Sequence, residues 1–332
     1  MDVLSDPEPF VALIEVAVGL MLLTKAADLF VDGAVATAAA ANVSPVVVGA
    51  VVVGFGTSAP ELLVSGLAAA NGDVDLGVGN IVGSNVANLS LVLGAAALIV
   101  PILVTRSVLA REAPLSLLSV ILFAAFALGG FEVWEGVVLL VVLVAVLAWI
   151  VLGGSPDSVE VLDVEAHEFS VGRSMSETVG GLLGTLLGAQ LMVWGAIAIA
   201  DDLGVSGGFI GFTLVAVGTS LPELVTAVVA ARKGETELIL GNLLGSNVFN
   251  SLAVGGVIAV VASGPIDDEL MRTYGLALMV LVATLAWVFM VARRRVSKIE
   301  AGLLLSAYAA AVFLLSELGG ADSIRDAIER IV

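Results

Sequence analysis

The chain has 332 residues, of which 59% are hydrophobic and only 13% are charged, and its mean hydropathy is +1.13. Soluble domains carry about 25% charged residues, so this composition excludes a disordered chain and argues against a soluble enzyme. The chain has no Cys, which excludes thiol chemistry and Cys-ligated zinc. Its single histidine, His167, lies in a polar loop, so a His-ligated metal site is excluded as well. We therefore expect a membrane protein that is not an enzyme.

The net charge is −18, from 13 Lys and Arg against 31 Asp and Glu. So few basic residues exclude a surface for nucleic acid. An excess of carboxylates is tolerated in concentrated salt, which screens their repulsion within about 3 Å at 1 M. The acidic balance therefore favours a salt-loving source, with a chance bias of the loops as the alternative.

Ten stretches have the length of about 20 apolar residues that a membrane-spanning helix needs. In chain order they cover residues 10–31, 43–70, 76–100, 113–129, 134–152, 179–200, 207–231, 238–262, 273–292 and 301–318. They lack the alternation of apolar and polar residues that is typical of a membrane β-barrel. The predicted fold is therefore an all-α polytopic membrane protein with ten transmembrane helices.

The distribution of positive charge predicts the orientation in the cell membrane. Three basic residues lie on one face, and nine lie in the loops after odd-numbered spans: Arg106, Arg111, Arg173, Arg232, Lys233, Arg293, Arg294, Arg295 and Lys298. The face with the excess is expected in the cytoplasm. Both termini are then extracellular, and the acidic loop 153–173 is cytoplasmic. We interpret this loop as a solvated linker, with a regulatory calcium site as the alternative.

Two further charged groups have local interpretations. Lys25 and Asp28 lie one turn apart in the first span and are predicted to pair, with Asp28 in the ion pathway as the alternative. The basic residues 293–295 together with Lys298 are interpreted as a topology anchor. Binding of anionic lipid is the alternative for this cluster.

The chain contains an internal repeat with a constant offset of 162 residues. GFGTSAPEL at 54–62 matches AVGTSLPEL at 216–224 in six of nine positions, and GNIVGSNVAN at 79–88 matches GNLLGSNVFN at 241–250 in seven of ten. Because five spans lie in each half, the second half enters the membrane inverted. We predict a first repeat at 1–152 with motifs 54–65 and 79–88, and a second at 174–318 with motifs 216–227 and 241–250. An extracellular tail, 319–332, follows.

Glu61 and Glu223 lie within spans two and seven, where a charged carboxylate costs several kcal/mol unless it is paired or faces water. Each follows a Gly-Thr-Ser-x-Pro segment, which predicts a helix broken near the bilayer midplane and backbone carbonyls free to coordinate a cation. Together with nearby hydroxyl groups, the carboxylates form the all-oxygen environment that Ca2+ prefers. Structural carboxylates that tie helices together are the alternative. The hydroxyls belong to Thr57, Ser58, Thr219 and Ser220.

The second motif adds a further polar set. Ser84 and Asn88 share one helix face at i,i+4, as do Ser246 and Asn250, and we expect these four side chains to line the ion site. The remaining amides are expected to form hydrogen bonds between helices, and a structural role for the whole set is the alternative. They belong to Asn80, Asn85, Asn242 and Asn247. Glycines in the same motif permit close approach of helices.

The duplicated motifs resemble those of the sodium/calcium exchanger family, of prokaryotic type, in the calcium/cation antiporter superfamily. The resemblance implies two inverted five-helix repeats that exchange Na+ for Ca2+ by alternating access, electrogenically and without a cofactor. It assigns Glu61 and Glu223 to Ca2+ and Na+, and the backbone carbonyls of Thr57 and Thr219 to Ca2+. The sodium sites would be lined by Ser58, Ser220, Ser84 and Ser246, and the centre completed by Asn88 and Asn250. Gly54 and Ala216, at the starts of the first motifs, are further candidates.

The resemblance also defines the alternatives. Some relatives have Asp where this chain has Asn250, so two carboxylates remain here. The proton-coupled branch typically has G-N-x-x-E in place of the Gly-Thr-Ser-x-Pro-Glu found here, which favours sodium coupling. A proton- or potassium-coupled exchanger of the same fold is the first alternative, and a cation channel is the second. By resemblance, spans one and six are the moving helices. The lipid bilayer and the two ions are the expected partners, and no protein partner is indicated.

Overall fold

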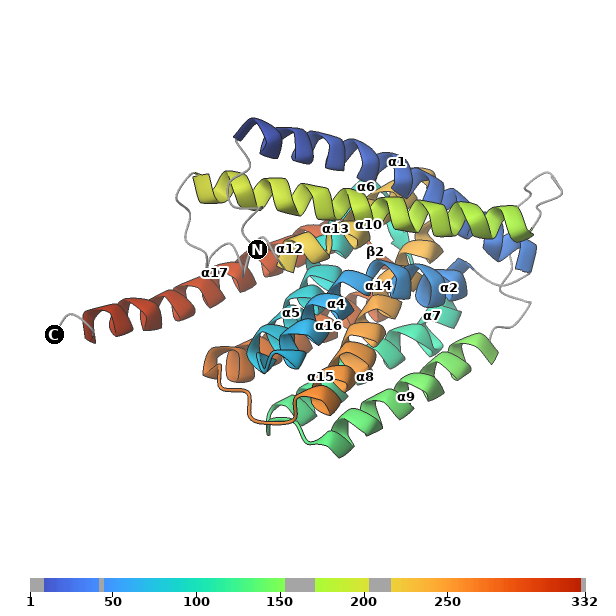
Figure 1. Cartoon of the computed structure of the whole chain (residues 1–332). Coiled ribbons are helices and arrows are strands. Elements are labelled where there is room, and N and C mark those ends of the chain that lie inside the picture. The colour runs from blue at the N-terminus through green and yellow to red at the C-terminus, as the bar shows by residue number, and fades with distance from the viewer. Residues whose placement is uncertain (1–8, 42–44, 153–170, 203–215, 330–332) are drawn as a thin grey trace. The chain divides into compact units, whose positions relative to one another are not determined.

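A computed structural model describes residues 9–41, 45–152, 171–202 and 216–329 (Figure 1). Nearly all of these residues are helical, which confirms the predicted all-α membrane fold. The exceptions within the described ranges include two short antiparallel strands, β1 (Ile102–Leu103) and β2 (Arg295–Val296). Most of the predicted acidic loop 153–173, including His167, lies outside the described residues.

The chain forms two compact units, and each unit combines segments of both predicted repeats. Unit 1 comprises residues 1–61 and 147–246, and unit 2 comprises residues 62–146 and 247–332. The chain passes from one unit to the other directly after Glu61, Val146 and Ser246. The predicted repeats at 1–152 and 174–318 are defined by the internal sequence match. The division into two compact units does not test them, so they stay a prediction.

Three of the described helices, α4, α9 and α14, have residues in both units. The helices that lie wholly or partly in unit 1 are given next in chain order. They are α1 (Pro9–Ala41), α2 (Pro45–Val48), the π-helical η1 (Gly49–Val53), α3 (Gly54–Thr57), α4 (Ala59–Ala70), α9 (Val133–Leu152), α10 (Val171–Asp202), α12 (Ala216–Thr219), α13 (Leu221–Lys233) and α14 (Thr236–Val248). The helices of unit 2 are α5 (Val74–Ala87), η2 (Asn88–Val92), α6 (Leu93–Ile99), α7 (Arg106–Ala110), α8 (Glu112–Ala127), η5 (Phe249–Val254), α15 (Gly255–Val261), η6 (Met271–Gly275), α16 (Leu276–Arg293) and α17 (Lys298–Glu329).

Six stretches of the described chain are long and apolar enough to cross a membrane. They are Val74–Ile99, Arg106–Ala127, Val133–Val151, Thr236–Val261, Met271–Arg293 and Lys298–Leu315, and the bent pair Pro45–Thr57 and Ala59–Ala70 forms a seventh if it is one span. Large apolar side chains such as Leu63, Val144 and Leu281 are more than 60% exposed, as expected where lipid is the solvent. The predicted number of ten spans stays a prediction. The last predicted span ends at residue 318, but the helix α17 continues through most of the predicted tail to Glu329.

Unit 1 is built around the antiparallel pair α1 and α10, which lie side by side (Figure 1). Small residues recur on α1 every seven positions at Ala12, Gly19, Ala26 and Gly33, and on α10 at Gly181, Gly188 and Gly195. A spacing of seven keeps one face of each helix turned toward its partner. A Cβ atom added to Gly33 would lie 2.4 Å from the Thr178 backbone nitrogen, and one added to Gly188 would lie 2.5 Å from that of Leu23. The two backbones are therefore in direct contact along a glycine seam.

A lysine at the end of α13 connects that helix to α1. Lys233 Nζ lies 2.8 Å from Asp32 Oδ1 and 3.5 Å from Asp28 Oδ1. The predicted pairing of Asp28 with Lys25 is therefore wrong. Residues 28 and 32 are one turn apart on α1 and both face the end of α13, where Gly234 (φ +80°) stops the helix.

Unit 2 contains the two strands and a second set of close helix contacts. A Cβ atom on Gly94 of α6 would lie 3.1 Å from the Ala301 carbonyl of α17, and one on Gly136 of α9 would lie 2.8 Å from the Gly256 carbonyl of α15. Asp73 caps α5 by accepting a hydrogen bond from the Leu76 nitrogen at 3.0 Å. Glycines at these contacts thus allow the backbones of neighbouring helices to approach closely.

Adjacent glycines on α10 provide a matched test of the glycine seam. A Cβ atom on Gly181 would lie 2.4 Å from the Phe30 backbone nitrogen, whereas one on Gly180 meets nothing within 4 Å. We expect Gly181→Ala to destabilise the fold by about 1–3 kcal/mol through overpacking. Gly180→Ala should stabilise it by about 0.5–1 kcal/mol, because alanine restricts the unfolded chain. Thermal unfolding of both variants in detergent gives the comparison, and equal melting temperatures would contradict the close contact.

A pH-dependent contribution is expected from Glu235, in the turn between α13 and α14. Burial, and then the charge of Asp32, raise the pKa of Glu235 above its ordinary value of 4.5, while Lys233 acts in the opposite direction. The folded state therefore holds the proton more tightly than the unfolded chain, and ionised Glu235 destabilises the fold at neutral pH. Glu235→Gln should raise the melting temperature at pH 7–8, and the difference should disappear below pH 4.5. A constant difference across this range would show that the effect is not titration of this group.

Candidate ion-binding site

Both Gly-Thr-Ser-x-Pro-Glu segments interrupt a helix at the serine. Ser58 (φ −85°, ψ 10°) separates α3 from α4, and Ser220 (φ −88°, ψ 5°) separates α12 from α13. Pro60 and Pro222 follow in the first turn of the next helix, where an N–H group has no helical partner to lose. The segments before and after Ser58 are bent by 45°. The predicted breaks are thus present, with nearly the same backbone conformation in both repeats.

The glutamate after each break is buried. Glu61, in the first turn of α4, and Glu223, in the first turn of α13, have no exposed surface. Glu223 Oε1 accepts a hydrogen bond from Ser58 Oγ at 3.0 Å. Its second oxygen, Oε2, accepts none from the described residues. A buried carboxylate oxygen without a donor is costly, so this atom is available to a ligand.

Close packing of the first motif of one repeat against the second motif of the other builds this part of unit 1. Ser246 Oγ on α14 donates to the Gly54 carbonyl at 3.2 Å, and Thr57 Oγ1 donates to Asn242 Oδ1 at 3.2 Å. A Cβ atom on Gly245 would lie 2.5 Å from the carbonyl oxygen of Ala50. Glycines in the motif thus allow α14 to approach the broken helix closely enough for these hydrogen bonds.

Unit 2 holds a second polar cluster, formed by the amides of both repeats. Asn85 Nδ2 donates to Ser251 Oγ at 3.0 Å and lies 3.4 Å from Met279 Sδ. Asn247 Nδ2 donates to the Asn85 carbonyl at 3.4 Å, and Asn247 Oδ1 accepts from Asn88 Nδ2 at 3.2 Å. Asn85 and Asn247 therefore form the hydrogen bonds between segments that were predicted for them.

Like Oδ1 of Asn85, the side-chain oxygens of Asn88 and Asn250 have no hydrogen-bond donor among the described residues. Asn88 Oδ1 and both polar atoms of Asn250 have no hydrogen-bond partner within the described part of the chain, although both side chains are fully buried. Asn88 opens the π-helical segment η2, and Asn250 lies in the corresponding segment η5. Such single π-helical turns are frequent at functional sites.

The predicted site residues are all buried, and they fall into both units. Unit 1 contains Glu61, Thr57, Ser58, Thr219, Ser220, Glu223 and Ser246, and unit 2 contains Ser84, Asn88 and Asn250. Of the two further candidates, Gly54 is buried with its carbonyl hydrogen-bonded to Ser246, and Ala216 begins α12. No group of three His, Asp or Glu side chains able to hold a metal occurs within the ranges described.

Two polar residues of these clusters were not identified from the sequence. Thr226 lies one turn beyond Glu223 on α13, is 1% exposed, and its hydroxyl has no hydrogen-bond partner among the described residues. Its position at i+3 from Glu223 is a signal that could have been used. Ser251, the acceptor for Asn85, has leucine at the corresponding place in the first repeat, so the internal comparison gives no signal for it.

Comparison with known proteins agrees with these motifs. A sequence profile of the family described as "Sodium/calcium exchanger protein" matches residues 11–152 and 178–316. The chain is 40% identical over 316 residues to the putative antiporter CaxA of Alkalimonas amylolytica, covering 92% of this chain and 98% of that protein. It is 32% identical over 279 residues to the sodium/calcium exchanger MaX1 of Methanosarcina acetivorans, covering 72% and 80% respectively.

A solved structure gives the same result. The fold matches that of the sodium-calcium exchanger NCX_Mj soaked with Na+ and Sr2+, with a TM-score of 0.82 and 34% sequence identity. The match covers 92% of this chain and 98% of that one. The profile and the relatives together cover most of the chain, including both copies of both motifs. The chain therefore belongs to the sodium/calcium exchanger family, whose members are membrane antiporters and not enzymes.

Proposed function

We propose that the protein exchanges Na+ for Ca2+ across the cell membrane by alternating access. The observation that carries this proposal is the set of buried oxygens without hydrogen-bond partners among the described residues. Within the duplicated motifs they include Oε2 of Glu223, Oδ1 of Asn88 and Asn250, and Oγ of Ser220. These residues lie in the duplicated motifs, and oxygens of this kind are the ligands that Ca2+ and Na+ require. Family membership and the match to NCX_Mj support the same assignment.

The donor set suits a calcium ion that alternates with sodium. Ca2+ takes six to eight oxygens at about 2.3–2.6 Å in adaptable geometry. We assign Glu61 and Glu223 to both ions, with the backbone carbonyls of Thr57 and Thr219 completing calcium binding. Asn88 and Asn250 complete the centre with neutral oxygens. The remaining ligands, mainly for Na+, are Ser58, Ser220, Ser84 and Ser246.

Exchange follows from the charge of the two carboxylates. One Ca2+ neutralises Glu61 and Glu223, and Na+ ions compete for the same oxygens, so the two occupancies exclude each other. An empty site leaves two charges unneutralised within apolar surroundings, which opposes a change of access. Occupancy lowers that barrier. If more than two Na+ replace each Ca2+, every cycle moves net charge, and the proposed exchange is electrogenic.

The antiparallel pair α1 and α10 is proposed as the moving element. These helices correspond to predicted spans one and six, and their glycine seam makes them a single rigid pair. We further propose that both termini are extracellular and that residues 153–173 are cytoplasmic, because nine of twelve loop and terminal positive charges lie on that face.

The decisive experiment is calcium uptake into sodium-loaded liposomes diluted into sodium-free buffer. We expect uptake that requires the sodium gradient, is unaffected by a protonophore and by replacing external potassium with choline, and is lost in Glu61→Gln. The variant should keep the gel-filtration profile and melting temperature of the native protein, because it removes charge with little change of shape. Retained uptake at normal calcium affinity in Glu61→Gln would overturn the site assignment.

The controls separate the alternatives. Uptake driven by a pH gradient, or uptake that depends on potassium, would keep the fold and the glutamate pair but change the coupling ion. Calcium currents that follow voltage without a sodium gradient would replace the exchanger with a channel. A valinomycin-imposed potential should change the rate of sodium-driven uptake if the exchange moves net charge.

Two amides offer a matched pair for separating ion binding from structure. Asn250 has no hydrogen bond within the described chain, so Asn250→Ala should leave the melting temperature nearly unchanged. It should raise the calcium concentration for half-maximal uptake about tenfold, the equivalent of about 1.4 kcal/mol of lost ligand interaction. Asn85→Ala removes the donor to Ser251 and should lower stability by about 1 kcal/mol with little effect on calcium affinity. The reverse pattern would assign Asn250 a structural role.

A further inference from the structure

A cluster of positive charge lies at one corner of unit 2, where β1 pairs with β2. This basic corner consists of Arg106, Arg111, Arg293, Arg294, Arg295 and Lys298, six of the 13 basic residues of the chain. Leu103 pairs with Arg295 in the ladder, and the Val104 nitrogen donates to the Arg294 carbonyl at 2.9 Å. Adjacent strands lie about 4.8 Å apart, so the ladder brings the start of α7 next to the connection between α16 and α17.

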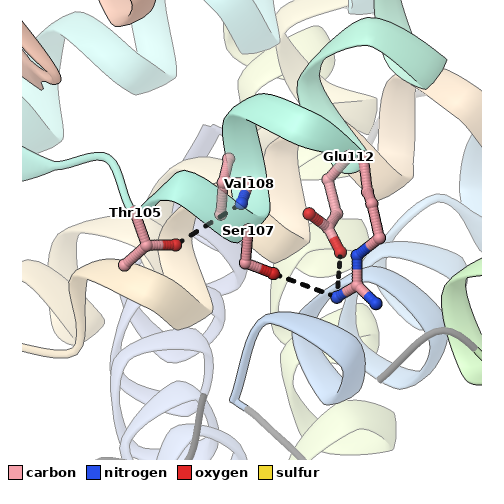
Figure 2. A network of polar contacts seen from close by, with 5 residues as sticks. Thr105, Ser107, Val108 and Glu112 are labelled. Carbon is pink, nitrogen blue, oxygen red and sulfur yellow. Dashed lines mark hydrogen bonds and ion pairs between the residues drawn. The ribbon is translucent and has the colours of Figure 1, made fainter. Parts of the chain in front are cut away.

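Only part of this charge is neutralised within the protein. Arg111 pairs with Glu112 at 3.0 Å and also donates to Ser107, in the network at the start of α8 that Figure 2 shows. Arg293 lies 3.6 Å from Glu300, whose other oxygen accepts hydrogen bonds from Ser297 at the start of α17.

Four basic side chains of the corner are exposed and form no ion pair with another described residue. They belong to Arg106, Arg294, Arg295 and Lys298. Four exposed basic side chains without a described ion pair thus lie together in a chain whose net charge is −18.

The candidate membrane spans place this corner at the boundary of the bilayer. Three of them begin or end at its residues: Arg106–Ala127, Met271–Arg293 and Lys298–Leu315. Two apolar side chains between the basic residues are turned outward, since Leu103 is 59% exposed and Ile299 is 70% exposed. Basic side chains beside exposed apolar ones at the end of a span match the transition from lipid headgroups to acyl chains.

We propose that the basic corner binds the headgroup of an anionic phospholipid. The phosphate lies among the guanidinium groups of Arg294 and Arg295, with Lys298 and Arg106 adding charge and Leu103 and Ile299 contacting the acyl chains. Arginine is suited to phosphate because its planar group donates two parallel hydrogen bonds. The exposed apolar residues favour a lipid over a soluble acidic protein. This inference needs the membrane location of the chain but not its transport activity.

Quenching of tryptophan fluorescence by brominated lipid tests the proposal. Trp287 on α16 lies six residues before Arg293, about 9 Å along the helix axis, so it reports on acyl chains beside the corner. The protein is reconstituted in liposomes of phosphatidylcholine containing brominated phosphatidylglycerol, or brominated phosphatidylcholine at the same mole fraction. Subtracting the signal of Trp287→Phe isolates the contribution of this tryptophan.

The expected result is stronger quenching of Trp287 by brominated phosphatidylglycerol than by brominated phosphatidylcholine. Arg294→Gln/Arg295→Gln should reduce the relative affinity for phosphatidylglycerol about 25-fold, because each basic residue near the surface contributes about a fivefold preference. The matched control Arg173→Gln/Arg232→Gln removes two exposed arginines of unit 1 and should retain the preference.

Three outcomes would overturn the proposal. Equal quenching by the two lipids would show that the corner does not select charge. An equal loss in the control variant would show only a general effect of net charge. A preference for phosphatidylglycerol that survives in Arg294→Gln/Arg295→Gln would place lipid selection elsewhere.

Discussion

The structure depends on the need to satisfy polar groups inside a chain that is 59% hydrophobic. A buried oxygen without a donor is unfavourable in apolar surroundings, and most amides here avoid that cost by pairing with one another. Within the duplicated motifs, exceptions include Glu223, Asn88, Asn250 and Ser220, and others such as Glu112 and Ser116 lie outside the motifs. In the proposed site, a bound cation would supply the interaction that these atoms lack, which would link ion binding to folding.

Glycine makes this arrangement compatible with tightly packed helices. The approach of α14 to the broken helix at Ser58 requires Gly245, and the contact between α1 and α10 requires glycine at intervals of seven residues. In lipid there is no hydrophobic force between apolar helices, so close backbone contact and hydrogen bonds must supply the attraction. The same residues that stabilise each unit thus determine which polar groups can reach one another.

Much of the architecture was predictable because apolar length, helix-breaking residues and internal repetition are local properties of the sequence. The break at Ser58 and the roles of Asn85 and Asn247 follow from such patterns. The partner of Asp28 did not, because Lys233 is 205 residues away and only the packing of α13 on α1 brings the two together. Ser251 escaped attention for a related reason, since its role depends on a contact with Asn85 rather than on its own neighbours.

Ser251 also makes the two repeats chemically unequal. Asn85 donates to Ser251, but the position equivalent to Ser251 in the first repeat is Leu89, which offers Asn247 no acceptor, and Asn247 turns to a backbone carbonyl instead. Two identical inverted halves would give an alternating transporter inward- and outward-open states of equal energy. Under the proposed alternating access, the unequal hydrogen bonds at matching positions remove this degeneracy and favour one of the two states.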